Sequence, residues 1–138
     1  AAYWAWVKKG EEEGKYWTCN MLCAMVDAQQ SGGKKTLVLS DAAHVNWYYF
    51  ESPAMRASDP RLDPIYDMKD PAKAAAFLRD ELGITHVLRA VDHEYTSNIT
   101  FYYSIIEKVL ADRTLCRAVA ATKNHVLFEF LPPEGAKP

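Results

Sequence analysis

The sequence has little of the composition that marks specialised classes of protein. Its 138 residues include only three cysteines, six glycines and seven prolines, and 16 basic and 18 acidic side chains leave a formal net charge of -2. So little glycine and proline excludes collagen-like and disordered chains. A near-neutral chain also lacks the basic surface of DNA- and RNA-binding proteins. Because a chain of this length can bury a core without cross-links, we expect one globular domain that binds no nucleic acid.

Long apolar runs and phosphate-binding loops are missing as well. No run approaches the length of about 18 apolar residues that a transmembrane helix needs, and the N-terminus lacks the order of a signal peptide. The only paired glycines, in Ser31–Gly33, stand before a strand-like run and lack the spacing of nucleotide-binding motifs. The chain as given is therefore expected to be soluble and to hold no cofactor.

The three cysteines predict neither a zinc site nor a thioredoxin-like site. Cys19 and Cys23 stand one helical turn apart, with no second pair of ligands nearby in the sequence. A thioredoxin-like site needs a closer pair at a helix start that follows a strand. We therefore expect no metal. In an oxidising compartment Cys116 would pair with Cys19 or Cys23, and the alternative is that all three thiols are buried and unpaired.

The N-terminal segment 1–13 combines aromatic residues with lysines. Three aromatic residues within its first six positions precede Lys8 and Lys9, an order typical of a chain that leaves a bilayer. The segment is therefore interpreted as juxtamembrane-like or as a boundary of the fragment. In the alternative interpretation Trp4 and Trp6 pack on the domain as part of a terminal strand or helix.

Hydrophobic periodicity, helix caps and turn residues predict alternating helices and strands over 14–131, followed by a flexible tail over 132–138. The expected elements are a helix over Tyr16–Gln30, a strand over Thr36–Leu39, a short helix over Ala42–Phe50, a helix from Pro71 to Gly83, a strand over Ile84–Leu88, a helix that Thr96 or Ser97 caps and that ends near Asp112, and a hairpin of Arg117–Thr122 and His125–Leu131. This order predicts an α/β three-layer sandwich, with a small mixed sheet that has two parallel central strands and a C-terminal β-hairpin.

A proline-rich loop is expected over Ser52–Asp70. Three Asp-Pro pairs, the last of which ends at Pro71, favour turns there. Loops of this length are uncommon in compact domains and are often functional. The loop is interpreted either as a docking element for a protein partner, over Pro53–Pro71, or as a packed surface crossover.

Candidate binding residues follow the two parallel strands. Because the carboxyl ends of parallel strands meet at one edge of a sheet, polar residues that follow each strand are expected to gather there. His86, inside an apolar strand, is expected to be a hydrogen-bonded core histidine, and His125 at the hairpin turn is expected on the surface. No catalytic residue is assigned. The candidate substrate-binding residues are Asp41, His44, Arg61, Asp92, His93 and Glu94.

Four stretches of the chain resemble a known domain. They are Thr36–Leu39 with the aromatic run Trp47–Phe50 and then Pro53, the stretch Phe77–Leu88 that contains Leu-Gly-Ile-Thr-His-Val-Leu, the helix end Val109–Asp112, and the closing strand Val126–Leu131. Together they resemble the soluble C-terminal domain of multi-spanning bacterial glycosyltransferases, the mannosyltransferase-like membrane enzymes that use polyprenyl-phosphate-linked sugars. The resemblance spans about Leu22 to Leu131.

The resemblance implies an accessory domain that is not catalytic by itself, in a parent protein that is a glycosyltransferase. It implies a place on the extracytoplasmic, periplasmic face of the inner membrane, with the membrane part of the parent enzyme as partner and a lipid-linked sugar or glycan acceptor as ligand. No catalytic residue of the family transfers to this chain. Two other functions are kept open, a free-standing ligand-binding or enzyme domain, then cytoplasmic, and a protein-interaction module that docks through the proline-rich loop.

Overall fold

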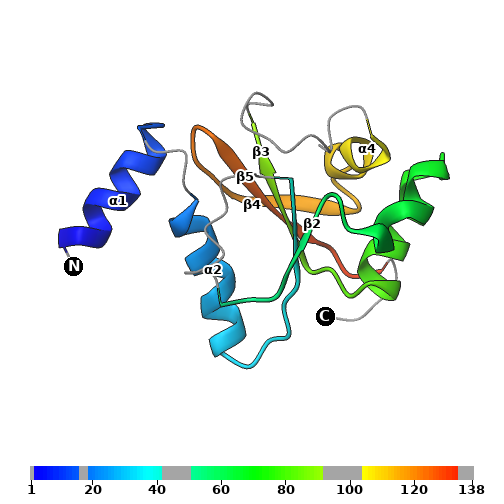
Figure 1. Ribbon diagram of the computed structural model, residues 1–138, viewed down its shortest axis with the longest axis horizontal. Helices are drawn as coiled ribbons and strands as arrows, with labels where there is room; N and C mark the ends of the chain where they lie inside the picture. Colours follow the sequence, from blue (N-terminus) through cyan, green and yellow to red (C-terminus); the bar gives the residue numbers. More distant parts are fainter. Residues whose placement is uncertain (1, 16–18, 42–50, 92–103, 134–138) are drawn as a thin grey trace.

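The computed structural model describes residues 2–15, 19–41, 51–91 and 104–133, in which helices and strands alternate (Figure 1). The helical elements are α1 (Ala2–Glu12), α2 (Asn20–Ser31), the 3-10 helix η1 (Pro60–Asp67), α3 (Pro71–Ala76), the π-helical turn η2 (Phe77–Glu81) and α4 (Ile105–Ala111). The strands are β1 (Val38–Ser40), β2 (Ala54–Arg56), β3 (His86–Ala90), β4 (Cys116–Ala121) and β5 (His125–Phe130). No helix in the described ranges is long and apolar enough to cross a membrane.

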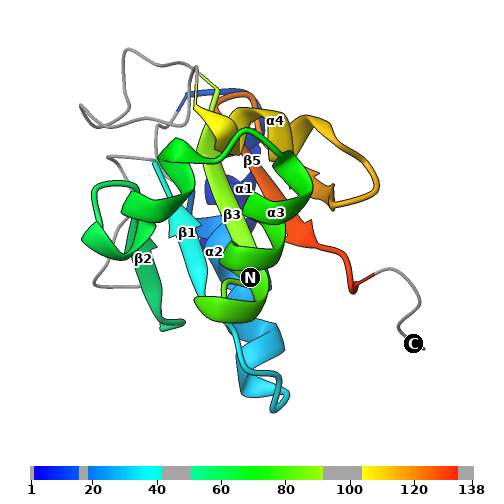
Figure 2. The same cartoon turned by 90° about the vertical axis from the view of Figure 1, so that its right-hand side faces the viewer.

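The five strands form one mixed sheet between two helical layers. Their order is β2-β1-β3-β5-β4, in which β1 is parallel to both β2 and β3, and β5 is antiparallel to β3 and β4. Helices α1 and α2 lie on one side of the sheet, and α3 and α4 lie on the other (Figures 1 and 2). The predicted α/β class, with parallel central strands and a C-terminal hairpin, is confirmed.

Strand β3 is the centre of the core because both of its faces are covered. Leu88 and Ala90 pack toward α2, in a cluster with Leu22 and Val26 of that helix. Val87 points to the opposite face, into the larger cluster that α3, η2 and α4 complete. The described strand residues His86–Leu88 are at most 1% exposed.

The sequence predicted a loop over 52–70, but the segment contains regular secondary structure. It contains β2, which extends the parallel part of the sheet, and η1, whose Leu62 and Ile65 are completely buried. Strand β2 forms because Ala57 N–H donates to Ser40 O at 3.0 Å and Val38 N–H donates to Pro53 O at 3.0 Å. These are contacts with a distant strand, so no local pattern announces them. The segment is a packed crossover over the described residues 51–70.

The helix that begins at Pro71 follows its local signals. The Asp70 carboxylate accepts the Ala72 N–H at 2.9 Å, Pro71 occupies the first helical position, and Gly83 ends the unit at a φ of +75°. The expected helix is confirmed, although its last turn, η2, is π-helical rather than α-helical.

Several expected boundaries shift. β3 begins at His86 instead of Ile84, because the Thr85 hydroxyl accepts the Leu37 N–H at 3.0 Å in place of a backbone carbonyl. α4 begins at Ile105, and its cap is Ser104, whose hydroxyl accepts the Ile106 N–H at 3.2 Å. The expected caps Thr96 and Ser97, like the expected helix Ala42–Phe50, lie outside the described residues.

Helix α2 begins at Asn20, later than the predicted Tyr16, and an acid from α1 caps it. The Glu11 carboxylate accepts the Asn20 N–H at 2.8 Å and the Met21 N–H at 3.0 Å. These amides belong to the first helical turn, whose N–H groups have no partner within the helix. Cys19, the residue at the cap position, makes no side-chain cap bond. Glu11 therefore fastens α1 to the body of the domain.

Replacement of Glu11 by alanine is expected to lower the free energy of unfolding by about 1–3 kcal/mol, because two part-buried N–H groups at the start of α2 lose their carboxylate acceptor. Urea unfolding followed by circular dichroism measures the change. Glu12→Ala is the matched control, since the Glu12 side chain is 55% exposed in a 3.9 Å ion pair with Lys8, and its effect should stay within about 0.5 kcal/mol. Equal stabilities of the two variants would contradict the capping role.

Candidate functional site

Asp41 lies at the carboxyl ends of the parallel strands, as the sequence predicts. Its carboxylate, however, is hydrogen-bonded to a backbone N–H group. It accepts the Ala90 N–H at 2.9 Å, while the Asp41 N–H donates to Leu88 O at 3.4 Å. Asp41 is 2% exposed. The carboxylate therefore ties the end of β1 to the end of β3, which is a structural role.

Of the other candidate residues, only Arg61 lies among the described residues. Its guanidinium contacts the Asp59 carboxylate at 2.9 and 3.1 Å on the exposed surface of η1. The Arg61 hydrogen bonds are the main reason that the pKa of Asp59 is lowered. His44, Asp92, His93 and Glu94 lie outside the described residues. Among the described candidate residues, Asp41 lies at this edge of the sheet, whereas Arg61 belongs to η1.

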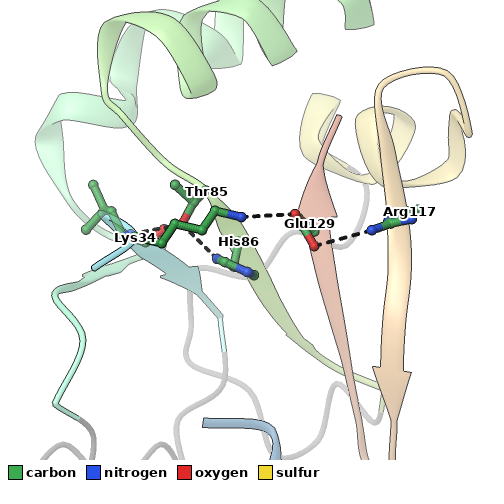
Figure 3. Close-up of polar contacts among 6 residues, drawn as sticks. Lys34, Thr85, His86, Arg117 and Glu129 are labelled. Carbon is green, nitrogen blue, oxygen red and sulfur yellow. Dashed lines mark hydrogen bonds and ion pairs between the residues drawn. The ribbon is translucent and has the colours of Figure 1, made fainter. Parts of the chain in front are cut away.

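The sequence analysis missed a cluster of polar side chains (Figure 3). It lies near the amino ends of the parallel strands β1 and β3. Glu129 of β5 accepts from Lys34 Nζ at 3.3 Å, and its second oxygen lies 3.8 Å from an Arg117 nitrogen on β4. His86 is the direct partner of Glu129 across the β3–β5 ladder. These residues come from four separate segments, so no spacing along the chain signals that they meet.

Thr85 and His86 form the buried side of this cluster. The Thr85 hydroxyl accepts the Leu37 N–H at 3.0 Å and lies 3.1 Å from Leu37 O and 2.7 Å from His86 Nδ1. His86 is 0% exposed, and its Nε2 has no hydrogen-bond partner among the described residues. Burial lowers the pKa of His86, nearby Glu129 opposes that shift, and Lys34 adds to it. The expectation of a core histidine with a hydrogen bond is confirmed.

A cavity of about 270 Å³ lies beside the cluster, and a larger cavity of about 580 Å³ adjoins it. Lys34, Thr85 and Glu129 line the smaller one, and Arg79 and Pro132 line both. The Arg79 guanidinium is already engaged, because it contacts the Asp80 carboxylate at 2.8 and 2.9 Å and Leu131 O at 3.4 Å. The polar groups that line the smaller cavity thus serve contacts within the protein.

His125 corrects the sequence-based expectation of a surface position, because it is 0% exposed. The hairpin turn that it follows contacts the segment after α1. Gly14 lies so close to the Lys123 side chain that a Cβ at Gly14 would stand 2.5 Å from Lys123 Cδ. The His125 N–H donates to the Thr122 hydroxyl at 3.2 Å. Contacts between residues so far apart are not revealed by local sequence.

All three cysteines are free and buried, which is the alternative of buried, unpaired thiols, and Cys116 is not paired with Cys19 or Cys23. Cys19 and Cys23 belong to the cluster under α2, with their sulfurs 3.7 Å apart, whereas Cys116 belongs to the cluster on the other face of the sheet. Contact with Cys23, with burial, raises the pKa of Cys19, and burial raises the pKa of Cys116 to about 11. Neither Cys19 nor Cys116 is a thiolate at neutral pH, so neither is an activated nucleophile.

Within the described ranges no group of three or more histidine, cysteine or acidic residues is placed to hold a metal ion. Comparison with protein-family models, with curated proteins and with solved structures found no similar protein.

The pH dependence of stability is expected to show the burial of His86. The pKa of His86 is lowered in the folded protein, so the unfolded chain, with an ordinary histidine pKa of about 6.5, binds its proton first. The contribution of His86 is complete above that pH and is lost as the pH falls below it, with a slope of at most about 1.4 kcal/mol per pH unit. Urea unfolding from pH 8 to about pH 5 measures this loss.

The matched control for this experiment is His86→Gln, which keeps a polar side chain of similar length but does not titrate. Wild type is expected to lose more stability than this variant across the window. Parallel curves for the two proteins would show that His86 has the same pKa in the folded and unfolded states, against the prediction.

Proposed function

We propose that the chain is a non-catalytic accessory domain of a membrane glycosyltransferase that takes sugars from polyprenyl-phosphate-linked donors. The observation that carries the proposal is the arrangement of the segments on which the family resemblance rests. The described parts of these segments contain β1, β3 and β5, which are far apart in the sequence and adjacent in the sheet. The segments that carry the resemblance therefore include three neighbouring strands at the centre of one sheet.

The contacts of three described carboxylates favour an accessory role over a catalytic one. A general acid or base needs a carboxyl group that can reach a substrate. Asp41 is instead buried against the Ala90 N–H, and Glu11 is buried against the start of α2. Glu129 lies between Lys34 and Arg117. Each of these carboxylates has a structural partner.

The proposal assigns acceptor or donor binding to the edge where β1 and β3 end. Asp41 draws the ends of β1 and β3 together. In the sequence His44 follows β1, and Asp92, His93 and Glu94 follow β3. Ligands of open α/β sheets bind outside the carboxyl ends of the parallel strands. The domain would then sit on the extracytoplasmic face, beside the membrane part of the parent enzyme.

The test is sugar transfer by the whole gene product in membrane vesicles, with a polyprenyl-phosphate-linked sugar as donor. Asp92→Asn and His93→Gln are expected to raise the KM for donor or acceptor and to leave kcat unchanged, because an accessory site contributes binding only. Lys73→Gln, on the exposed surface of α3, is the control and should change neither constant. A collapse of kcat at constant KM, or turnover by the 138-residue chain alone, would contradict the proposal.

A further inference from the structure

Cys19 and Cys23 form a buried pair of thiols at the start of α2. Their sulfurs lie 3.7 Å apart. Cys19 is 1% exposed, and Cys23 is 7% exposed. Both belong to the apolar cluster between α2 and the sheet, whose other buried members are Leu22, Val26, Val38, Leu88, Ala90 and Leu127. The two thiols are thus held side by side within the core of the domain.

Cys19 lies at the cap position, before the regular part of the helix. Its φ of -131° and ψ of 35° are not helical, although its carbonyl accepts the Cys23 N–H at 2.9 Å. In a regular helix the Cβ atoms of residues four apart are about 5–6 Å from each other, whereas a disulfide holds them at about 3.8 Å. Because Cys19 precedes the helix, rotation of this one cap residue can bring the two Cβ atoms closer.

The surroundings of the pair favour a disulfide over a bound metal ion. Contact with Cys23 and burial raise the pKa of Cys19, and the negative charge of Glu11 adds to this shift. The thiolates that a metal ion needs are therefore disfavoured, and the described residues place no third ligand beside the pair. A disulfide carries no charge, so it suits an apolar cluster.

We propose that Cys19 and Cys23 form a reversible disulfide and that glutathione disulfide, or a small disulfide of the same class, is the oxidant. After local opening of the helix start, the Cys23 thiol loses its proton and its sulfur attacks the oxidant. The S–S bond of the oxidant breaks, and the first glutathione leaves as a thiolate that takes up a proton.

The second step closes the link within the protein. The Cys19 thiol loses its proton, its sulfur attacks the Cys23 sulfur in the mixed disulfide, and the second glutathione leaves as a thiolate that takes up a proton. Two protein thiols are oxidised, and one glutathione disulfide is reduced to two glutathione thiols. The inference is independent of the proposed function.

The new bond changes the contact between α1 and α2. Asn20, whose N–H donates to the Glu11 carboxylate at 2.8 Å, directly follows Cys19. Movement of Cys19 toward Cys23 therefore displaces a group that fastens α1 to α2. A disulfide that strains its surroundings is reduced more readily than a relaxed one. The link is for this reason expected to be reversible.

Cys116 provides a control within the same chain. It is 1% exposed, like Cys19, but it lies in the cluster on the opposite face of the sheet, apart from the other two cysteines. Its sulfur donates to Val109 O at 3.3 Å. Burial alone therefore distinguishes Cys116 from Cys19 much less than the neighbouring sulfur of Cys23 does.

The test exposes the reduced 138-residue chain to glutathione disulfide without denaturant, alkylates the remaining thiols in denaturant and maps the peptides by mass spectrometry. Two of the three thiols are expected to be lost, with Cys19 linked to Cys23 and the mass lowered by two hydrogen atoms. Dithiothreitol should restore both thiols. Cys116→Ser should form the link like wild type, and Cys23→Ser should form none.

Three free thiols after this treatment, or glutathione adducts without an internal link, would overturn the inference, as would a link that forms only in urea. The change at the cap is tested by Glu11→Ala, which should shift the urea midpoint less in the oxidised chain than in the reduced chain. Equal shifts would contradict the displacement of Asn20. None of these results bears on the proposed function, which sugar transfer by the whole gene product tests separately.

Discussion

Burial of β3 on both faces determines where every other element lies. Its residues alternate between the α2 layer and the layer of α3, η2 and α4, so neither layer is dispensable. On one edge β3 pairs with β1 and on the other with β5, and this joins the parallel and antiparallel halves of the sheet. Helix α2 is held in turn by the buried carboxylate of Glu11, which brings α1 into the fold.

The same burial decides which polar groups remain available for chemistry. Side chains that enter the core beside β3 must find partners there, and Asp41 and Thr85 do so through the backbone of neighbouring strands. His86, with one satisfied nitrogen, is held with a lowered pKa. Such groups stabilise the sheet and are unsuited to catalysis.

The elements that local sequence specifies were predictable, and those that depend on distant contacts were not. Asp70 and Gly83 delimit a helix by capping and by a positive φ, both properties of the local backbone. β2 exists only because β1 supplies hydrogen-bond partners. Glu11 stands in a run of charged residues that looks solvated, and the turn before His125 contacts Gly14, which is far away in the sequence. The Lys34–Glu129 pair joins residues separated by most of the chain, beyond the reach of any sequence motif.

The claim that this domain belongs to a membrane-embedded transferase is tested most directly by reading the gene upstream of Ala1. Our proposal predicts several apolar segments of about 20 residues in the same reading frame, each long enough to cross a bilayer. The loops between those segments would then be the place to look for the catalytic acid. A reading frame without such segments would contradict the proposal and would make this α/β domain a soluble protein in its own right.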